Sequence, residues 1–126
     1  MAVISALTLE GFSPRYIRNI PNHLQGRNMN MPKGYLVANI RVTDADKFAA
    51  FSGMAGPVIK AYGGKVLAKG PDAERHEGNV TGTVMMIEFD SLSAARKFYL
   101  SDEYQAAKAI RDACSETDLM LIEGTN

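Results

Sequence analysis

Two titratable side chains are the strongest candidates for acid–base chemistry in this 126-residue chain. His76 lies between Arg75 and Glu77 in a polar stretch, where an imidazole can give or take a proton near neutral pH. Glu88 is a carboxylate in an otherwise apolar stretch, and burying it is costly unless it is hydrogen-bonded. We predict His76 and Glu88 as catalytic residues. The structural alternatives are an exposed loop histidine for His76 and an interface hydrogen-bond network for Glu88.

Four further side chains are candidate ligand contacts. Asn39 is a second polar residue within an apolar stretch, and it needs a hydrogen-bond partner if it is buried. Tyr62, Tyr99 and Tyr104 combine apolar rings with phenol hydroxyls, a composition common in pockets for small organic molecules. We predict all four as ligand-binding residues. Ordinary core packing is the alternative for the tyrosines, and the interface network is the alternative for Asn39.

Two arginines and the single cysteine are expected to have structural roles. Arg96 and Arg111 could attract an anionic substituent, but we expect a solvated helix face around both. Cys114 falls in helical register with apolar residues, which favours a buried small side chain over a nucleophile.

Composition disfavours several classes of function. Fourteen basic and fourteen acidic residues give a formal net charge of +0, and no basic run suits a nucleic acid. The apolar stretches are too short to span a membrane and the first residues make no convincing signal peptide, so with a lone cysteine we expect the cytoplasm. No nucleotide-binding, nucleophile-elbow or metal-binding motif is present, and we predict neither a metal nor a cofactor.

Hydrophobic periodicity predicts the elements that position these residues. Alternating and short apolar runs predict four strands, over residues 35–42, 65–69, 80–89 and 119–122. Helical spacing follows Thr43 and Asp46, which resemble a capping box. We expect the glycines and proline within residues 53–57 to divide that helix into two short pieces.

Two serines mark the remaining helical segments. Ser91 and Ser101 each precede a helical pattern and can cap it, and Gly63 suits the end of the earlier helix. The polar segment 70–79, which holds His76, is expected to be a loop.

The order β-α-β-β-α-β predicts an α+β fold of the ferredoxin-like type, an antiparallel sheet in the order 4-1-3-2 with the helices on one face. The opposite face is too apolar for water, because Tyr35, Val37, Val84 and Met86 point to it. We therefore expect a homodimer whose two sheets pack face to face. Arg41 and Glu88 stand too far apart to pair within one subunit and could pair across that interface.

The chain divides near residue 32. Residues 1–32 contain three arginines, one glutamate and three prolines, and no strong periodicity. We interpret residues 1–32 as an N-terminal arm and residues 33–126 as the folded domain.

Several short motifs, taken in order, resemble one known family. They are YLVANIRVTD at 35–44, AYGGK at 61–65, EG at 77–78, IEFDSLSAAR at 87–96, YLSDEYQ at 99–105 and LIEG at 121–124. Together they resemble the domain of unknown function 1330 family. The resemblance implies a ferredoxin-like, dimeric α/β barrel and brings no established reaction with it.

The wider dimeric α/β barrel superfamily includes cofactor-free monooxygenases, haem-binding proteins and lactone isomerases. By analogy we expect a homodimer that binds a small organic ligand between sheet and helices. Catalysis, if present, would be cofactor-independent oxygenation or isomerisation, with His76 or Glu88 moving a proton. The alternative is a non-catalytic structural or binding dimer, and haem binding is a further one.

Overall fold

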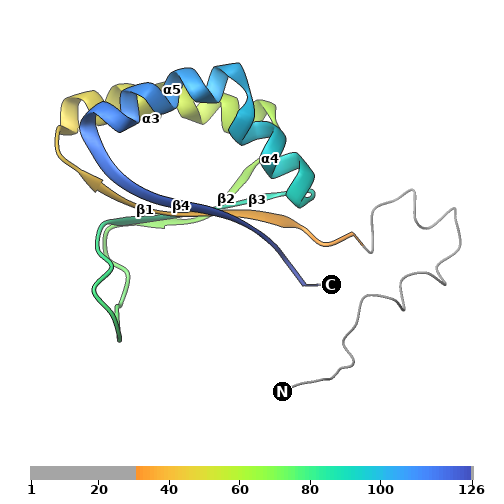
Figure 1. Ribbon diagram of the computed structural model, residues 1–126, viewed down its shortest axis with the longest axis horizontal. Helices are drawn as coiled ribbons and strands as arrows, with labels where there is room; N and C mark the ends of the chain where they lie inside the picture. The colour runs from red at the N-terminus through yellow and green to blue at the C-terminus, as the bar shows by residue number, and fades with distance from the viewer. Residues whose placement is uncertain (1–30, 126) are drawn as a thin grey trace, which may run out of the picture. The chain divides into compact units, whose positions relative to one another are not determined.

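The structure is a computed structural model that describes residues 31–125. Its elements, in chain order, are β1 (Gly34–Val42), α3 (Ala45–Ala61), β2 (Lys65–Gly70), β3 (Thr83–Phe89), α4 (Leu92–Leu100), α5 (Asp102–Cys114) and β4 (Ser115–Glu123). The strands form one antiparallel sheet in the order β2-β3-β1-β4, and the helices lie on one face of it (Figure 1). This confirms the predicted α+β, ferredoxin-like fold and its strand order. The predicted arm, residues 1–32, lies almost wholly outside the described residues and stays a prediction.

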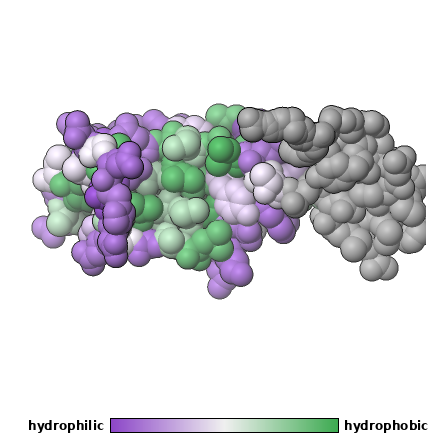
Figure 2. Space-filling view, turned by 90° about the horizontal axis from the view of Figure 1, so that it is seen from below, coloured by the Kyte–Doolittle hydropathy of each residue, from purple (hydrophilic) through white to green (hydrophobic). Residues whose placement is uncertain are grey.

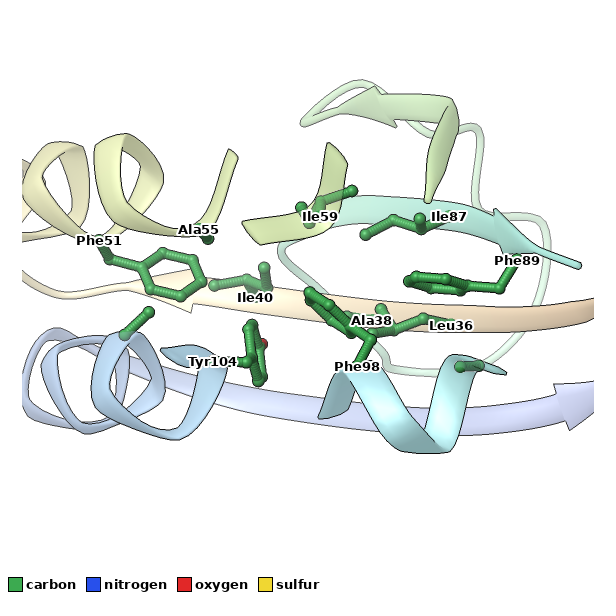
Figure 3. Close-up of a cluster of buried hydrophobic side chains, with 12 residues drawn as sticks. Leu36, Ala38, Ile40, Phe51, Ala55, Ile59, Ile87, Phe89, Phe98 and Tyr104 are labelled. Carbon is green, nitrogen blue, oxygen red and sulfur yellow. The ribbon is translucent and has the colours of Figure 1, made fainter. Parts of the chain in front are cut away.

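Alternation along β1 decides which side chains enter the core. Leu36, Ala38 and Ile40 are buried beneath the helices, whereas the residues between them are only partly covered. Figure 3 shows these side chains meeting Phe51 from α3 and Phe98 from α4. An apolar layer between sheet and helices is therefore the core of the domain.

Helix α3 corrects one prediction. We expected two short pieces, but a single helix of 17 residues runs from Ala45 to Ala61 with Pro57 inside it. Pro57 lacks the N–H that would bond to the carbonyl of Gly53, and both residues are exposed, so water can reach that carbonyl. The buried stripe continues through the break, which keeps the helix docked: Phe51, Ala55 and Ile59.

Helix starts follow the predicted capping chemistry, with one exception. Ser91 accepts from the backbone N–H of Ala94 at 3.0 Å, and Ser101 accepts from that of Tyr104 at 3.1 Å. At the start of α3, however, the cap is Asp44, which accepts from Lys47 N at 3.1 Å, and not Thr43. The negative charge of Asp44 also favours the positive end of the helix.

The predicted bounds of two strands need correction. β3 begins at Thr83, not at residue 80, because Gly82 has a φ of 112° and passes close to the carbonyl of Ile40. β4 begins at Ser115, not at residue 119, because Glu116 and Asp118 put charges on its exposed positions and hide the apolar pattern.

The face of the sheet opposite the helices, which we call the open face, is apolar at its centre. Register places Met86 of β3 and Met120 of β4 on either side of Val37. The exposed fraction is 56% for Met120 and 52% for Ile122. Figure 2 looks at this face and shows hydrophobic residues gathered between hydrophilic ends. Within the described residues, no helix has the length and apolar character needed to cross a membrane.

Candidate functional site

A cavity of about 140 Å³ lies between the sheet and the helices. Its floor is the buried face of β1 and β3, and its walls come from α3, α4 and α5. Figure 3 shows the side chains around it, among them Ile40, Phe51, Ile87, Phe98 and Tyr104. The lining is therefore mainly aliphatic and aromatic, as in sites for small organic molecules.

Arg111 of α5 lines this cavity and is only 4% exposed. Its Nη1 donates to the hydroxyl oxygen of Tyr104 at 2.7 Å, and its Nη2 lies 3.4 Å from a carboxylate oxygen of Asp112. The guanidinium carbon lies 6.0 Å from the ring centres of both Phe51 and Tyr104. Among the described residues, nothing accepts from its buried Nε. Arg111 thus gives the cavity a cationic lining residue, and its buried Nε is an unused donor.

The other charged residues beside the cavity leave its lining positive. Lys69, from β2, also lines the cavity. Asp112 is shared, because Lys108 donates to its other oxygen at 2.7 Å. That hydrogen bond from Lys108, more than the charge of Arg111, lowers the pKa of Asp112 below its usual value.

Tyr104 is the one predicted ligand contact among the cavity-lining residues that the structure describes. Its ring packs against Phe98 with centres 4.5 Å apart, and against Tyr99 at 5.6 Å. Burial raises the pKa of Tyr104 above its usual value of 10.0, although the nearby Arg111 opposes that shift. The hydroxyl therefore stays protonated at neutral pH.

The other two predicted tyrosines lie at the margin of the same helical layer. Tyr62, at the end of α3, donates to Glu103 at 3.2 Å and packs edge-on against Phe98. Tyr99 is half-buried beside Tyr104. Neither is among the residues that line the cavity, and their ligand-binding roles stay predictions.

Glu88 and Asn39 lie on the open face, on the other side of the sheet from the cavity. Tyr35, directly opposite Glu88 in the register, donates to its carboxylate at 3.1 Å, and this hydrogen bond raises the pKa of Tyr35. Asn39 accepts from Arg75 at 3.1 Å. Both polar groups thus have partners within the subunit.

Arg41 does not pair with Glu88 in the subunit, as expected from their separation. Instead Arg41 donates to Asp118 at 3.0 Å and to the carbonyl of Thr81 at 3.1 Å. A pair between Arg41 and Glu88 across a dimer stays a prediction.

His76 lies in the connection between β2 and β3, which extends past the open face in Figure 1. Its side chain is 80% exposed, and its ring nitrogen lies 3.2 Å from a carboxylate oxygen of Glu74. Arg75 holds the loop to the sheet by donating to the carbonyl of Gly82 at 2.9 Å. The structure therefore brings His76 and Glu88 together neither with each other nor with the cavity, and their catalytic roles stay predictions.

The environment predicted for Arg111 is wrong: it is buried, not on a solvated helix face. Its position carries the signal, since it lies seven residues after Tyr104, four after Ala107 and three before Cys114, all of which are buried. Helical spacing thus places Arg111 within the buried stripe of α5. Arg96 is exposed, as expected, and Cys114 is buried, as expected.

Solved structures with the same fold are distant in sequence. A protein of unknown function from Rhodopseudomonas palustris has 18% identity and a TM-score of 0.62, covering 86% of this chain and 96% of its own. SnoaB, a cofactor-independent oxygenase from Streptomyces nogalater, has 11% identity and a TM-score of 0.55, covering 75% and 95%. A dimeric ferredoxin-like protein of unknown function from Thermobifida fusca has 16% identity and a TM-score of 0.54, covering 74% and 92%. These likenesses show the fold.

Family membership rests on a sequence model. No curated protein matches the chain. The model described as "Domain of unknown function (DUF1330)" matches residues 33–125, which span β1 to β4 and every residue of the cavity lining. The chain belongs to this DUF1330 family.

Proposed function

We propose that this protein binds a small organic ligand in the cavity between its sheet and its helices, and that it does so as a homodimer. The observation that carries the proposal is the cavity itself, about 140 Å³ between the sheet and the helices. Protein interiors contain few voids larger than a water molecule, and an apolar cavity of roughly 150 Å³ can hold a benzene ring. A single six-membered ring therefore fits the space.

The open face supports the homodimer. An antiparallel sheet exposed to water on one side carries polar residues there, whereas this face carries Val37, Met86 and Met120 in one row across three strands. A second copy that presents the same patch covers the apolar patch of each subunit, because a two-fold interface is self-complementary. The Thermobifida fusca protein of the same fold, which is described as dimeric, adds support.

A catalytic form of the proposal keeps the predicted proton-transfer residues. Cofactor-independent oxygenation or isomerisation needs a group that moves a proton at the ligand. His76 and Glu88 lie outside the cavity, so they could serve only a ligand that reaches the open face. The fold shared with SnoaB supports oxygenation by analogy alone. Aerobic turnover of electron-rich phenols by the wild type, lost in His76→Ala or Glu88→Gln, would support it. A folded wild type without turnover would exclude the catalytic form of the proposal and leave the non-catalytic binding dimer.

Toluene tests the cavity proposal directly. Methyl NMR of the wild type titrated with toluene is expected to shift signals of lining residues, including Ile40 and Ile87. Ala55→Leu lengthens a lining side chain into the cavity and is expected to abolish these shifts. Ala49→Leu makes the same change on the exposed side of α3 and is expected to leave them intact. Absence of shifts in the wild type at saturating toluene would overturn the proposal.

A further inference from the structure

We propose that the ligand carries a carboxylate, and that Arg111 binds this group while the apolar cavity holds the body of the ligand. This inference rests on the proposed binding function. It names the chemical class of the ligand as a small monocarboxylate with a body the size of one ring.

The unused donor of Arg111 is the first argument. The residue is 4% exposed and, within residues 31–125, its Nε finds no acceptor. Buried polar groups are hydrogen-bonded in the great majority of proteins, so an orphan calls for a missing partner. A guanidinium presents its Nε–H and one Nη2–H in the same direction, which matches the two oxygens of a carboxylate. Nη2 carries two hydrogens, and its contact with Asp112 is long, at 3.4 Å.

The local charge is the second argument. Of the described residues that line the cavity, the charged ones are both basic, Lys69 and Arg111. The nearest carboxylate to Arg111 is that of Asp112, which Lys108 binds more closely, at 2.7 Å against 3.4 Å. The positive charge of Arg111 is therefore only partly balanced, and an anionic ligand completes the balance.

Tyr104 supplies the third argument. Its hydroxyl oxygen accepts from Arg111, so its own proton is available to donate to another oxygen. Because Tyr104 lies on the Nη1 side of the guanidinium, this proton is a second donor, separate from the Nε–H edge, for a ligand oxygen at the junction of α5 with the cavity. This arrangement favours a carboxylate over a neutral ring or an amine, because both groups present donors.

Benzoate and toluene separate charge recognition from cavity filling. Calorimetry and methyl NMR are carried out on the wild type, Arg111→Met and Arg96→Met with each probe. Arg111→Met is expected to weaken benzoate binding roughly tenfold or more, while toluene binding changes by less than about threefold. Arg96→Met removes the same charge from an exposed site on α4 and is expected to leave both affinities unchanged.

Failure of this inference is distinguishable from failure of the proposed function. Toluene binding without benzoate binding, or equal benzoate affinity in the wild type and Arg111→Met, would overturn the inference that Arg111 binds a carboxylate. Either result would leave the cavity proposal standing. Binding of neither probe would overturn both. Where Arg111→Met does not fold, Tyr104→Phe takes its place, with weaker benzoate binding expected and unchanged binding contradicting the inference.

Discussion

The hydroxyl oxygen of Tyr104 lies 2.7 Å from Nη1 of Arg111, two helical turns later on the same face of α5. Both residues are 4% exposed. A neutral phenol is thus the principal hydrogen-bond partner of a buried cation, and the stability of the domain depends on that phenol remaining in place.

Tyr104→Phe is expected to destabilise the fold in a pH-dependent way. At neutral pH, loss of the hydroxyl leaves Nη1 of Arg111 without its partner, which costs about 1–3 kcal/mol. Burial raises the pKa of Tyr104 in the folded state above 10.0, so above about pH 10 the unfolded wild type loses this proton first. The wild type therefore loses stability as the pH rises towards the raised pKa, and its advantage over Tyr104→Phe shrinks. Urea unfolding at about pH 8 and pH 10.5 measures the difference in unfolding free energy between the wild type and Tyr104→Phe at each pH. Equal differences at the two pH values would contradict the mechanism.

Asp112→Asn tests how the carboxylate beside Arg111 and Lys108 contributes to stability at acidic pH. Because Lys108 holds the pKa of Asp112 below its usual 3.8, the folded state favours the carboxylate. Its contribution is present above pH 3.8 and is lost as the pH falls through the lowered value. The wild type should therefore lose more stability than Asp112→Asn on acidification through that range. Thermal melts across the range check this, and parallel curves for the two proteins would count against it.

Most of the fold could be predicted because each buried element repeats a simple pattern. The alternation in β1 and the capping serines at positions 91 and 101 are local signals, and the structure follows them. The continuity of α3 through Pro57 was not predictable from local rules, since it depends on tertiary docking of Phe51, Ala55 and Ile59. At that point tertiary packing outweighs the low helix propensity of the glycines and the proline.

The cavity was less predictable than the fold. Aromatic residues at helical spacing indicated a pocket under the helices, and Tyr104 does line the cavity. Residue type argued against burial for Arg111, because charged side chains are almost never fully buried without a partner. The partner, Tyr104, becomes visible only when the buried stripe of α5 is traced through Arg111.

Gly34→Ala is expected to destabilise the domain strongly. Gly34 begins β1 against the start of α4, and a methyl group there would collide with the carbonyl of Ser91 and with Leu92 N, at 2.5 Å. Backbone atoms cannot move aside as a flexible side chain can, so we expect a loss of about 1–3 kcal/mol or more. Gly70→Ala is the control, because nothing lies within 4 Å of a methyl group there. Equal urea midpoints for the two variants would refute the close approach.

Gly53→Ala is expected to stabilise α3 by roughly 0.5–1 kcal/mol, because glycine in a helix interior has a larger conformational freedom to lose. The position is exposed, and a methyl group there meets nothing within 4 Å. Gly56→Ala also has open space but precedes Pro57, whose ring crowds a methyl group on the preceding residue. We expect a smaller gain there. Thermal unfolding of the two variants gives the comparison, and a larger gain for Gly56→Ala would contradict it.

Met120→Glu tests the homodimer on the open face. Met120 lies opposite Val37 at the apolar centre, and in a face-to-face dimer a carboxylate there would be buried without a partner in both copies. We expect the dimer dissociation constant to rise at least about a hundredfold. The subunit should remain folded, because Met120 is 56% exposed in it. Leu100→Glu is the control, since Leu100 ends α4 on the helical side and is 63% exposed. Sedimentation velocity at micromolar concentration should show a monomer for Met120→Glu alone. A wild type that sediments as a monomer, or a Met120→Glu variant that sediments as a dimer, would rule out this interface.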